Sequence, residues 1–321
     1  MGPAVEKRYC LAARLSATDG GTYEGTISQV CGGVGRNHAD ALTRLGVAVD
    51  FISVVGNDAN AHFAFRYCSH MNLKHVCQLD DIPTATYLAV NVKGAVNFGI
   101  GSIQNTVARI SPQLIRSKSD VIAAADYLLV DSNLSVEAIK AAVEIAASNG
   151  RPVWFEPTDV KKVGKIFDAN CFHLVHTISP NANEFVGLCD AIGLAIPNKD
   201  ILSDAEATAE FVLRHADQLL QTLDTLVVTL GAHGVVIVRR VEDNGRGRSE
   251  VTILPKPTCP SIESVSGGGD CFNAGLLAGR LKGLSWPDTT TLATRCAALS
   301  LQSTHPVPPS LSTLALLRNS H

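Results

Sequence analysis

The sequence lacks several features that would assign it to common protein classes. No apolar run reaches the roughly 18 residues of a membrane-spanning helix, and the N-terminus has no hydrophobic signal core. The nine cysteines are scattered and contain no Cys-x-x-Cys pair, so neither a disulfide framework nor a structural metal is expected. A net charge of −3 provides no basic surplus for nucleic acid. These absences predict a cytoplasmic protein that binds neither membrane nor nucleic acid, and whose partner is a small molecule.

The remaining composition favours an α/β protein. With 321 residues, 46% of them hydrophobic, the chain is long enough to bury a sizeable core. Short apolar runs alternate with segments of helical periodicity. The expected strands are 50–55, 127–130, 153–155, 174–178 and 226–230, and the expected helices are 36–45, 136–148, 205–221, 270–281 and 288–303. The alternation predicts a mostly parallel sheet covered by helices on both faces, with ligands gathered at the carboxyl ends of its strands.

Two hairpins interrupt this alternation. Residues 84–92 and 95–100 read as a two-stranded ribbon with a turn at Gly94, which is either an ordinary edge hairpin or a cover for a site. Residues 226–230 lead through a glycine-containing turn into a second hairpin strand at 235–238. The polar segment 240–250, rich in Gly and Arg, is predicted to be a disordered loop.

A glycine-rich turn near the C-terminus carries the clearest chemical signal. Gly267, Gly268 and Gly269 precede Asp270, which falls in the first turn of an expected helix. Glycines let the backbone approach a ligand closely, so that N–H groups converge on phosphate oxygens. A carboxylate there can accept a proton from a substrate hydroxyl. The pattern indicates phosphoryl transfer to an alcohol, although a simple turn with a helix cap is the alternative.

A second glycine-rich segment precedes the helix expected at 36–45. It does not match the dinucleotide-binding template, because His38 stands where the third glycine belongs. Backbone amides and the Asn37 side chain are instead suited to the hydroxyls of a polyol or ribose, which need both donors and acceptors. A plain helix cap is again the alternative.

The order and spacing of these motifs resemble one family. Three further signals contribute, namely Ser179-Pro180-Asn181-Ala182-Asn183-Glu184, the turn at 228–234 and the Gly-Gly-Gly-Asp loop. Over most of its length the chain is similar to the ribokinase-like (PfkB) carbohydrate kinases, with signatures at 32–46 and 264–275. Segments 33–37, 85–87, 131–133 and 155–158 look most like the eukaryotic pseudouridine kinases. The resemblance implies a three-layer α/β/α fold with a small β lid, here from about 11–30 and 82–103 of a single domain.

The resemblance also implies an activity, the ATP-dependent phosphorylation of the 5′-hydroxyl of pseudouridine. Asp270 would be the base, and the amides of Gly267, Gly268 and Gly269 would form the anion hole for the migrating phosphoryl group. Gly33 and Asn37 would hold the sugar, while Thr86 and Tyr87 on the ribbon would help to cover the base. Such a cover would exclude water.

The cofactors follow from the same resemblance. Asn181 and Glu184 match an N-x-x-E motif that acts through Mg²⁺ and its water shell, although this pair alone would suggest a helix cap. On the nucleotide side the matching residues are Thr229, Gly231, Gly234 and, more weakly, Asn273. Some relatives also bind a monovalent cation such as K⁺ through carbonyls that correspond to those near Ser264 and Val265. The sequence does not decide whether this chain binds such a cation or forms a homodimer.

The N-terminus departs from the family pattern. Members usually begin with an apolar strand that ends in a glycine pair, followed by an aspartate that holds sugar hydroxyls. Here the first acid after Glu6 is Asp19, so a central strand and a sugar ligand are expected to be missing. Gly268 also replaces a usual alanine, a change that we expect to be tolerated. The alternatives are a kinase for another nucleoside or sugar, and a non-catalytic protein of the same fold.

Overall fold

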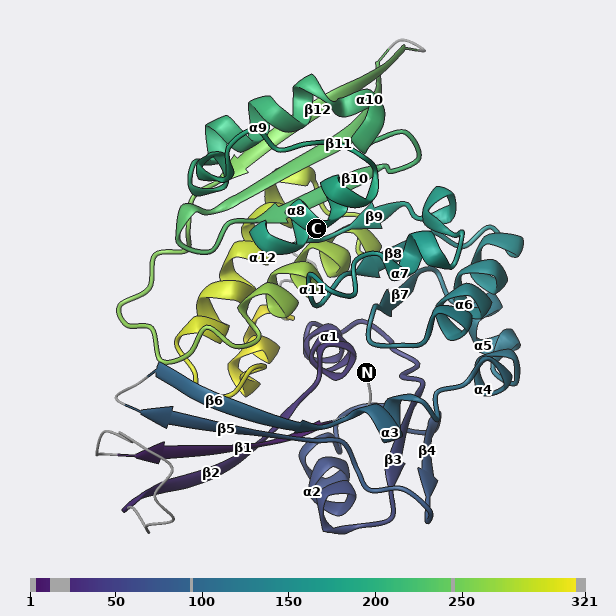
Figure 1. Ribbon diagram of the computed structural model, residues 1–321, viewed down its shortest axis with the longest axis vertical. Helices are drawn as coiled ribbons and strands as arrows, with labels where there is room; N and C mark the ends of the chain where they lie inside the picture. Colours follow the sequence, from purple (N-terminus) through teal and green to yellow (C-terminus); the bar gives the residue numbers. More distant parts are fainter. Residues whose placement is uncertain (1–3, 12–23, 93–94, 244–245, 316–321) are drawn as a thin grey trace. The chain divides into compact units, whose positions relative to one another are not determined.

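The chain folds into two compact units (Figure 1). The computed structural model describes residues 4–11, 24–92, 95–243 and 246–315. Unit 1 comprises residues 1–109 and 260–321, and unit 2 comprises residues 110–259. The chain thus returns to unit 1 for its last helices, which brings the two glycine-rich segments of the sequence into the same unit.

Unit 1 contains a four-stranded sheet, a two-stranded sheet and the helices around them. The strands are β1 (Ala4–Leu11), β2 (Gly25–Gly32), β3 (Ser53–Gly56), β4 (Val76–Leu79), β5 (Thr86–Val92) and β6 (Ala95–Ser102). The helices are α1 (Val34–Arg44), α2 (Ala59–Tyr67), α3 (Gln104–Val107), α11 (Gly268–Leu281), α12 (Trp286–Leu301) and the 3-10 helix η4 (Pro309–Leu314).

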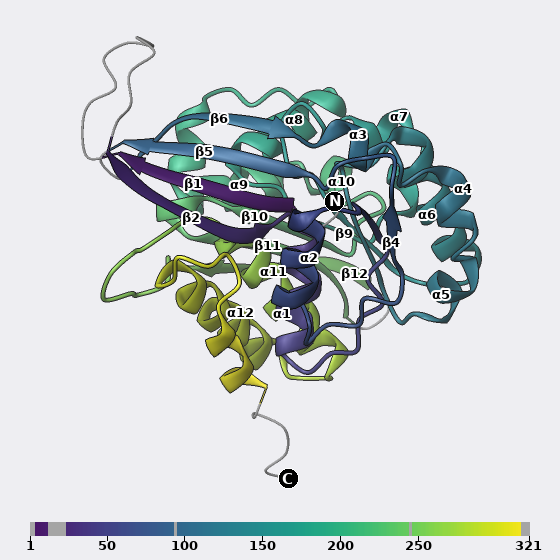
Figure 2. The same ribbon diagram turned by 90° about the horizontal axis from the view of Figure 1, so that it is seen from below.

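The four-stranded sheet has the order β2-β1-β5-β6 (Figure 2). Strand β1 is antiparallel to β2 and parallel to β5, and β5 is antiparallel to β6. The expected ribbon therefore exists and forms half of this sheet, while its turn lies outside the described residues. Strands β3 and β4 pair in parallel as a separate sheet.

Unit 2 is built on a six-stranded sheet of order β12-β11-β10-β9-β8-β7. Its strands are β7 (Leu128–Asp131), β8 (Val153–Glu156), β9 (Thr177–Ile178), β10 (Thr225–Thr229), β11 (Val235–Asp243) and β12 (Arg246–Leu254). Strands β7 to β10 are parallel, whereas β11 and β12 are antiparallel. The α-helices are α4 (Pro112–Arg116), α5 (Ser119–Ala124), α6 (Val136–Ser148), α7 (Lys165–Asp168), α8 (Ala182–Ala191), α9 (Ala205–Arg214) and α10 (Ala216–Leu219). Short 3-10 turns are η1 (Phe172–Leu174), η2 (Lys199–Ser203) and η3 (Gly231–His233).

This architecture confirms the predicted α/β class with a mostly parallel central sheet. The prediction of a disordered loop at 240–250 was wrong, because β11 and β12 pair in register through most of it. Glu250 accepts a 2.5 Å hydrogen bond from the facing Arg239. The N-terminal residues form β1, an inner strand of the small sheet. Among the described residues, the six-stranded sheet consists of β7 to β12, so the N-terminal segment contributes no strand to it.

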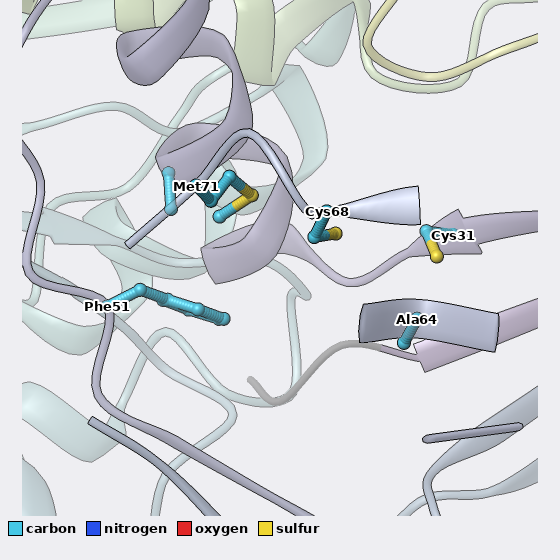
Figure 3. Packing of buried hydrophobic residues seen from close by; sticks show 6 residues of the cluster. Cys31, Phe51, Ala64, Cys68 and Met71 are labelled. Atoms are coloured by element: carbon cyan, nitrogen blue, oxygen red, sulfur yellow. The ribbon is translucent and has the colours of Figure 1, made fainter. Parts of the chain in front are cut away.

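A hydrophobic cluster anchors the start of α1 (Figure 3). Its buried members are Cys31, Ala39, Phe51, Ala64, Cys68 and Met71. Cys31 lies at the end of β2, where the side chain is completely buried. Burial of a large apolar side chain such as Phe51 or Met71 contributes roughly 1.5–3 kcal/mol to stability, so the cluster fixes the junction from which the first glycine-rich segment departs.

Candidate active site

The second glycine-rich turn forms the N-terminus of α11. Gly267 is the N-cap residue and has left-handed backbone angles, φ 84° and ψ −6°. A Cβ at this position would lie 2.2 Å from the carbonyl oxygen of Pro306, so the close approach also requires glycine. Gly269 is exposed, and a Cβ there would have no neighbour within 4 Å. The first-turn N–H groups of a helix lack intrahelical partners, and glycine offers no capping side chain. This end of α11 is therefore suited to an anion.

Asp270 lies in the first turn of α11, where its side chain is 16% exposed. One carboxylate oxygen, Oδ2, accepts a 2.6 Å hydrogen bond from Nδ2 of Asn37. The other, Oδ1, lies 3.9 Å from Nδ1 of His38. That ring nitrogen is 2.9 Å from the carbonyl oxygen of Val34, so the backbone is its nearer partner. The carboxylate is thus held on one oxygen by a neutral amide.

The two glycine-rich segments meet through this hydrogen bond, which joins residues 233 positions apart. Gly33 is the N-cap of α1, with φ 95°, and its carbonyl accepts the first helical bond from the Asn37 amide N–H at 2.8 Å. Asn37 is 5% exposed. Six of the predicted residues, namely Gly33, Asn37, Asp270 and the three glycines of the turn before it, therefore lie in unit 1.

Thr86 and Tyr87 occupy consecutive positions on β5, so their side chains point to opposite faces of the sheet. The Thr86 hydroxyl accepts a 3.2 Å bond from Asn60 and donates to the carbonyl of Thr84 at 3.1 Å. The Tyr87 ring lies across Gly99 of β6, where a Cβ would come within 2.2 Å of its hydroxyl oxygen. Only one of the two side chains can face a ligand on a given side of this sheet.

Unit 2 holds the predicted N-x-x-E motif at the start of α8. Asn181 is the N-cap, and its Oδ1 accepts from the backbone N–H groups of Asn183 and Glu184, each at 3.0 Å. Glu184 returns a bond by accepting from the Asn181 N–H at 2.9 Å. This is a capping box, and Glu184 is 3% exposed. Among the described residues, no group of three or more His, Cys, Asp or Glu side chains is placed to hold a metal. A single carboxylate beside a polar amide is nevertheless compatible with Mg²⁺ held through water.

The predicted nucleotide turn lies next to that motif. Thr229 ends β10, and its N–H donates to the carbonyl of Pro180 at 3.0 Å. Gly231 and Gly234 have positive φ angles of 59° and 95°. A Cβ at Gly234 would lie 2.2 Å from the Leu254 carbonyl oxygen, so the turn admits only glycine there without rearrangement. Asn273, the remaining predicted residue, belongs to α11 of unit 1 and is 3% exposed.

Sequence reasoning missed a buried charge network on α1. Asp40 is completely buried and accepts bonds from Arg36 at 2.7 Å, Arg44 at 2.7 Å and His70 at 2.6 Å. Burial raises the pKa of Asp40, but the hydrogen bond from His70 and the charges of Arg36 and Arg44 outweigh it, so the pKa falls below its ordinary value. The signal was present in the sequence, because these three α1 residues have i,i+4 spacing.

Comparison with known proteins decides the family. The profile of the pfkB family of carbohydrate kinases matches residues 7–313. The chain belongs to the pfkB carbohydrate kinase family. A pseudouridine kinase of Arabidopsis thaliana is 26% identical over 330 residues, which cover 90% of this chain and 86% of that relative.

Solved structures of a ribokinase and a nucleoside kinase share the fold. The ribokinase of Arabidopsis thaliana complexed with ribose and ATP superposes with a TM-score of 0.78 at 17% identity, covering 99% of this chain and 97% of that one. A nucleoside kinase of Burkholderia thailandensis in complex with inosine gives a TM-score of 0.67 at 19% identity, covering 95% and 91%. The predicted ribokinase-like fold is therefore confirmed.

Membership of the pfkB family makes the protein a phosphotransferase with an alcohol as acceptor. Kinases of this fold use ATP. None of the helices in the described part of the chain is both long and apolar enough to cross a membrane.

Proposed function

We propose that this protein transfers the γ-phosphoryl group of ATP to the 5′-hydroxyl of pseudouridine, giving pseudouridine 5′-phosphate and ADP. The observation that carries the proposal is the Asp270 carboxylate in the first turn of α11, directly after the glycine turn and hydrogen-bonded to Asn37. The similarity to the pseudouridine kinase of Arabidopsis supports the choice of substrate.

In this proposal the Asp270 carboxylate takes the proton of the acceptor, and the N–H groups of the glycine turn bind the phosphoryl group. Asp270 accepts the proton of the substrate hydroxyl through Oδ1, while Oδ2 stays on the Asn37 amide. The alcohol oxygen forms a bond to the γ-phosphorus as the bond from phosphorus to the ADP oxygen breaks. The N–H groups of Gly267, Gly268 and Gly269 stabilise the charge on the equatorial phosphoryl oxygens, and the helix adds a partial positive charge.

The other predicted residues complete the proposal. Gly33 and Asn37 hold the sugar, and Thr86 or Tyr87 covers the base. Thr229, Gly231, Gly234 and Asn273 contact ATP. Magnesium neutralises phosphate charge when bound, and Glu184 with Asn181 would hold it through water. The cysteines whose side chains the structure describes form no disulfide, which supports the cytoplasmic location that we propose.

A substrate panel tests the proposal. The purified protein is given ATP and Mg²⁺, with and without K⁺, and ADP release is followed with pseudouridine, uridine, inosine or ribose. We expect pseudouridine to give the highest kcat/KM. A higher value for another acceptor would replace the substrate but retain the kinase, whereas no ADP release with any acceptor would refute the activity and favour a non-catalytic protein.

A matched pair of variants tests the base. Asp270→Asn keeps the shape of the side chain but cannot take a proton, so kcat should fall by about 10²–10⁴-fold. Asp190→Asn, at an exposed position on α8, should leave kcat unchanged. Equal kcat values for the two variants would show that Asp270 is not the base.

A further inference from the structure

The Arg36 guanidinium is completely buried one residue before Asn37. Its Nη1 donates to Oδ2 of Asp40 at 2.7 Å, and its Nη2 donates to the carbonyl of Cys31 and to Oδ1 of Asn37. Its Nε donates to the Gly32 carbonyl at 3.3 Å, and the Tyr67 ring centroid lies 5.8 Å from the guanidinium carbon. The guanidinium therefore joins the end of β2, the charge network and the Asn37 amide.

These contacts determine the orientation of the Asn37 side chain. Arg36 can only donate hydrogen bonds, whereas an ionised carboxylate such as Asp270 can only accept them. An amide between the two must place its oxygen on Arg36 and its NH₂ group on Asp270. With Oδ1 fixed, the Nδ2 group that holds Asp270 loses its freedom to rotate.

We propose that Arg36 is a positioning residue for phosphoryl transfer, which locks the Asn37 amide so that Asp270 keeps Oδ1 directed to the substrate hydroxyl. The inference rests on the proposed function for its kinetic consequence only. The charge of Arg36 is balanced by the buried Asp40, and the planar fork reaches acceptors on four residues at once. A lysine ammonium, with three donors on one nitrogen, cannot replace it.

The kinetic test compares two arginines of α1 that share Asp40. Arg36→Met should lower kcat by about 10–100-fold while the KM for ATP stays within about twofold, because a positioning contact acts on the transition state. Arg44→Met removes another cation from Asp40, through a bond of 2.7 Å, but leaves the Arg36 contact with Asn37 in place. Its kcat should stay within about twofold of the parent value.

A double-mutant cycle separates positioning from general structural damage. If Arg36 acts through Asn37, Arg36→Met should cause no further loss of kcat in an Asn37→Ala background. The same fold loss in both backgrounds would overturn the proposal. Arg36→Lys keeps a positive charge for Asp40, and it replaces Arg36→Met if circular dichroism shows that the methionine variant is unfolded.

A measurement without substrate keeps this inference distinct from the proposed function. The side-chain NH₂ signals of Asn37, identified by their loss in Asn37→Ala, are followed by NMR during exchange into D₂O. Exchange should be at least about tenfold faster in Arg36→Met or Arg36→Lys than in the parent protein and in Arg44→Met. Unchanged exchange would overturn the positioning role even in an active kinase. If the parent protein phosphorylates no acceptor, the proposed function fails while faster exchange still supports the lock.

Discussion

The paired glycines at the start of α11 allow a sharp test of how this turn is built. An alanine at position 267 must adopt φ near 84°, which costs about 1–2 kcal/mol for a residue with a Cβ. That Cβ would also lie 2.2 Å from the Pro306 carbonyl oxygen. Relief of such overpacking costs about 1–3 kcal/mol. We therefore expect Gly267→Ala to lower the free energy of unfolding by about 2–5 kcal/mol.

The neighbouring position provides the control. A Cβ at Gly268 would lie 3.4 Å from Cδ2 of Leu301, an ordinary contact, and Gly268 belongs to the helix. Gly268→Ala should therefore change the free energy of unfolding by no more than about 1 kcal/mol, in the stabilising direction. Urea titration of both variants, followed by circular dichroism, measures the difference. Equal stability of the two variants would refute the reasoning from backbone angle and contact.

Three further predictions concern carboxylates. The pKa of Asp40 is lowered in the folded protein, so the contribution of its carboxylate to the free energy of unfolding is present above the ordinary pKa near 4 and is lost as pH falls through the folded value. Asp40→Asn should therefore lower the free energy of unfolding by about 3–5 kcal/mol at pH 7. Denaturant titrations that show the same deficit at pH 2 would contradict this. Asp58 caps α2 by accepting from the Ala61 N–H at 2.8 Å and also accepts the Thr84 hydroxyl at 2.7 Å; Asp58→Ala should cost about 1–2 kcal/mol in thermal or urea unfolding, and no change would rule out the cap. Glu184→Gln keeps a capping acceptor but loses a charge, so the Mg²⁺ concentration for half-maximal activity should rise at nearly unchanged stability; an unchanged Mg²⁺ titration would leave Glu184 only its capping role.

Elements with a local signal were predictable from the sequence. Helix α6 has the predicted bounds, because its apolar periodicity is regular and Ser135 caps it. The strand expected at 174–178 shrinks to Thr177–Ile178, since residues 172–174 form a 3-10 turn that the apolar run conceals. The polar segment 240–250 looked like a loop because its strand pairing depends on facing residues of the other strand, which composition does not reveal.

The same division holds for the candidate site. The placement of Asp270 and its glycines at the start of a helix was predictable because these residues are contiguous in the chain. The bond from Asn37 to Asp270 was not, since it spans 233 positions and depends on how α1 packs against α11. The importance of the Arg36–Asp40 pair depends on its burial, which the sequence does not reveal. The same i,i+4 pair on a solvated helix face would contribute only a few tenths of a kcal/mol to stability.

The carbonyl of Pro306 joins the glycine turn to the segment that follows α12. It accepts from the Ser300 hydroxyl at 2.9 Å and from the Cys271 thiol at 3.4 Å, and it occupies the space that a side chain at Gly267 would need. Burial raises the pKa of the Cys271 thiol, so the thiol keeps its proton for this bond. Ending the polypeptide before Pro306 would therefore remove the carbonyl that packs against Gly267 while leaving every residue of the glycine turn in place.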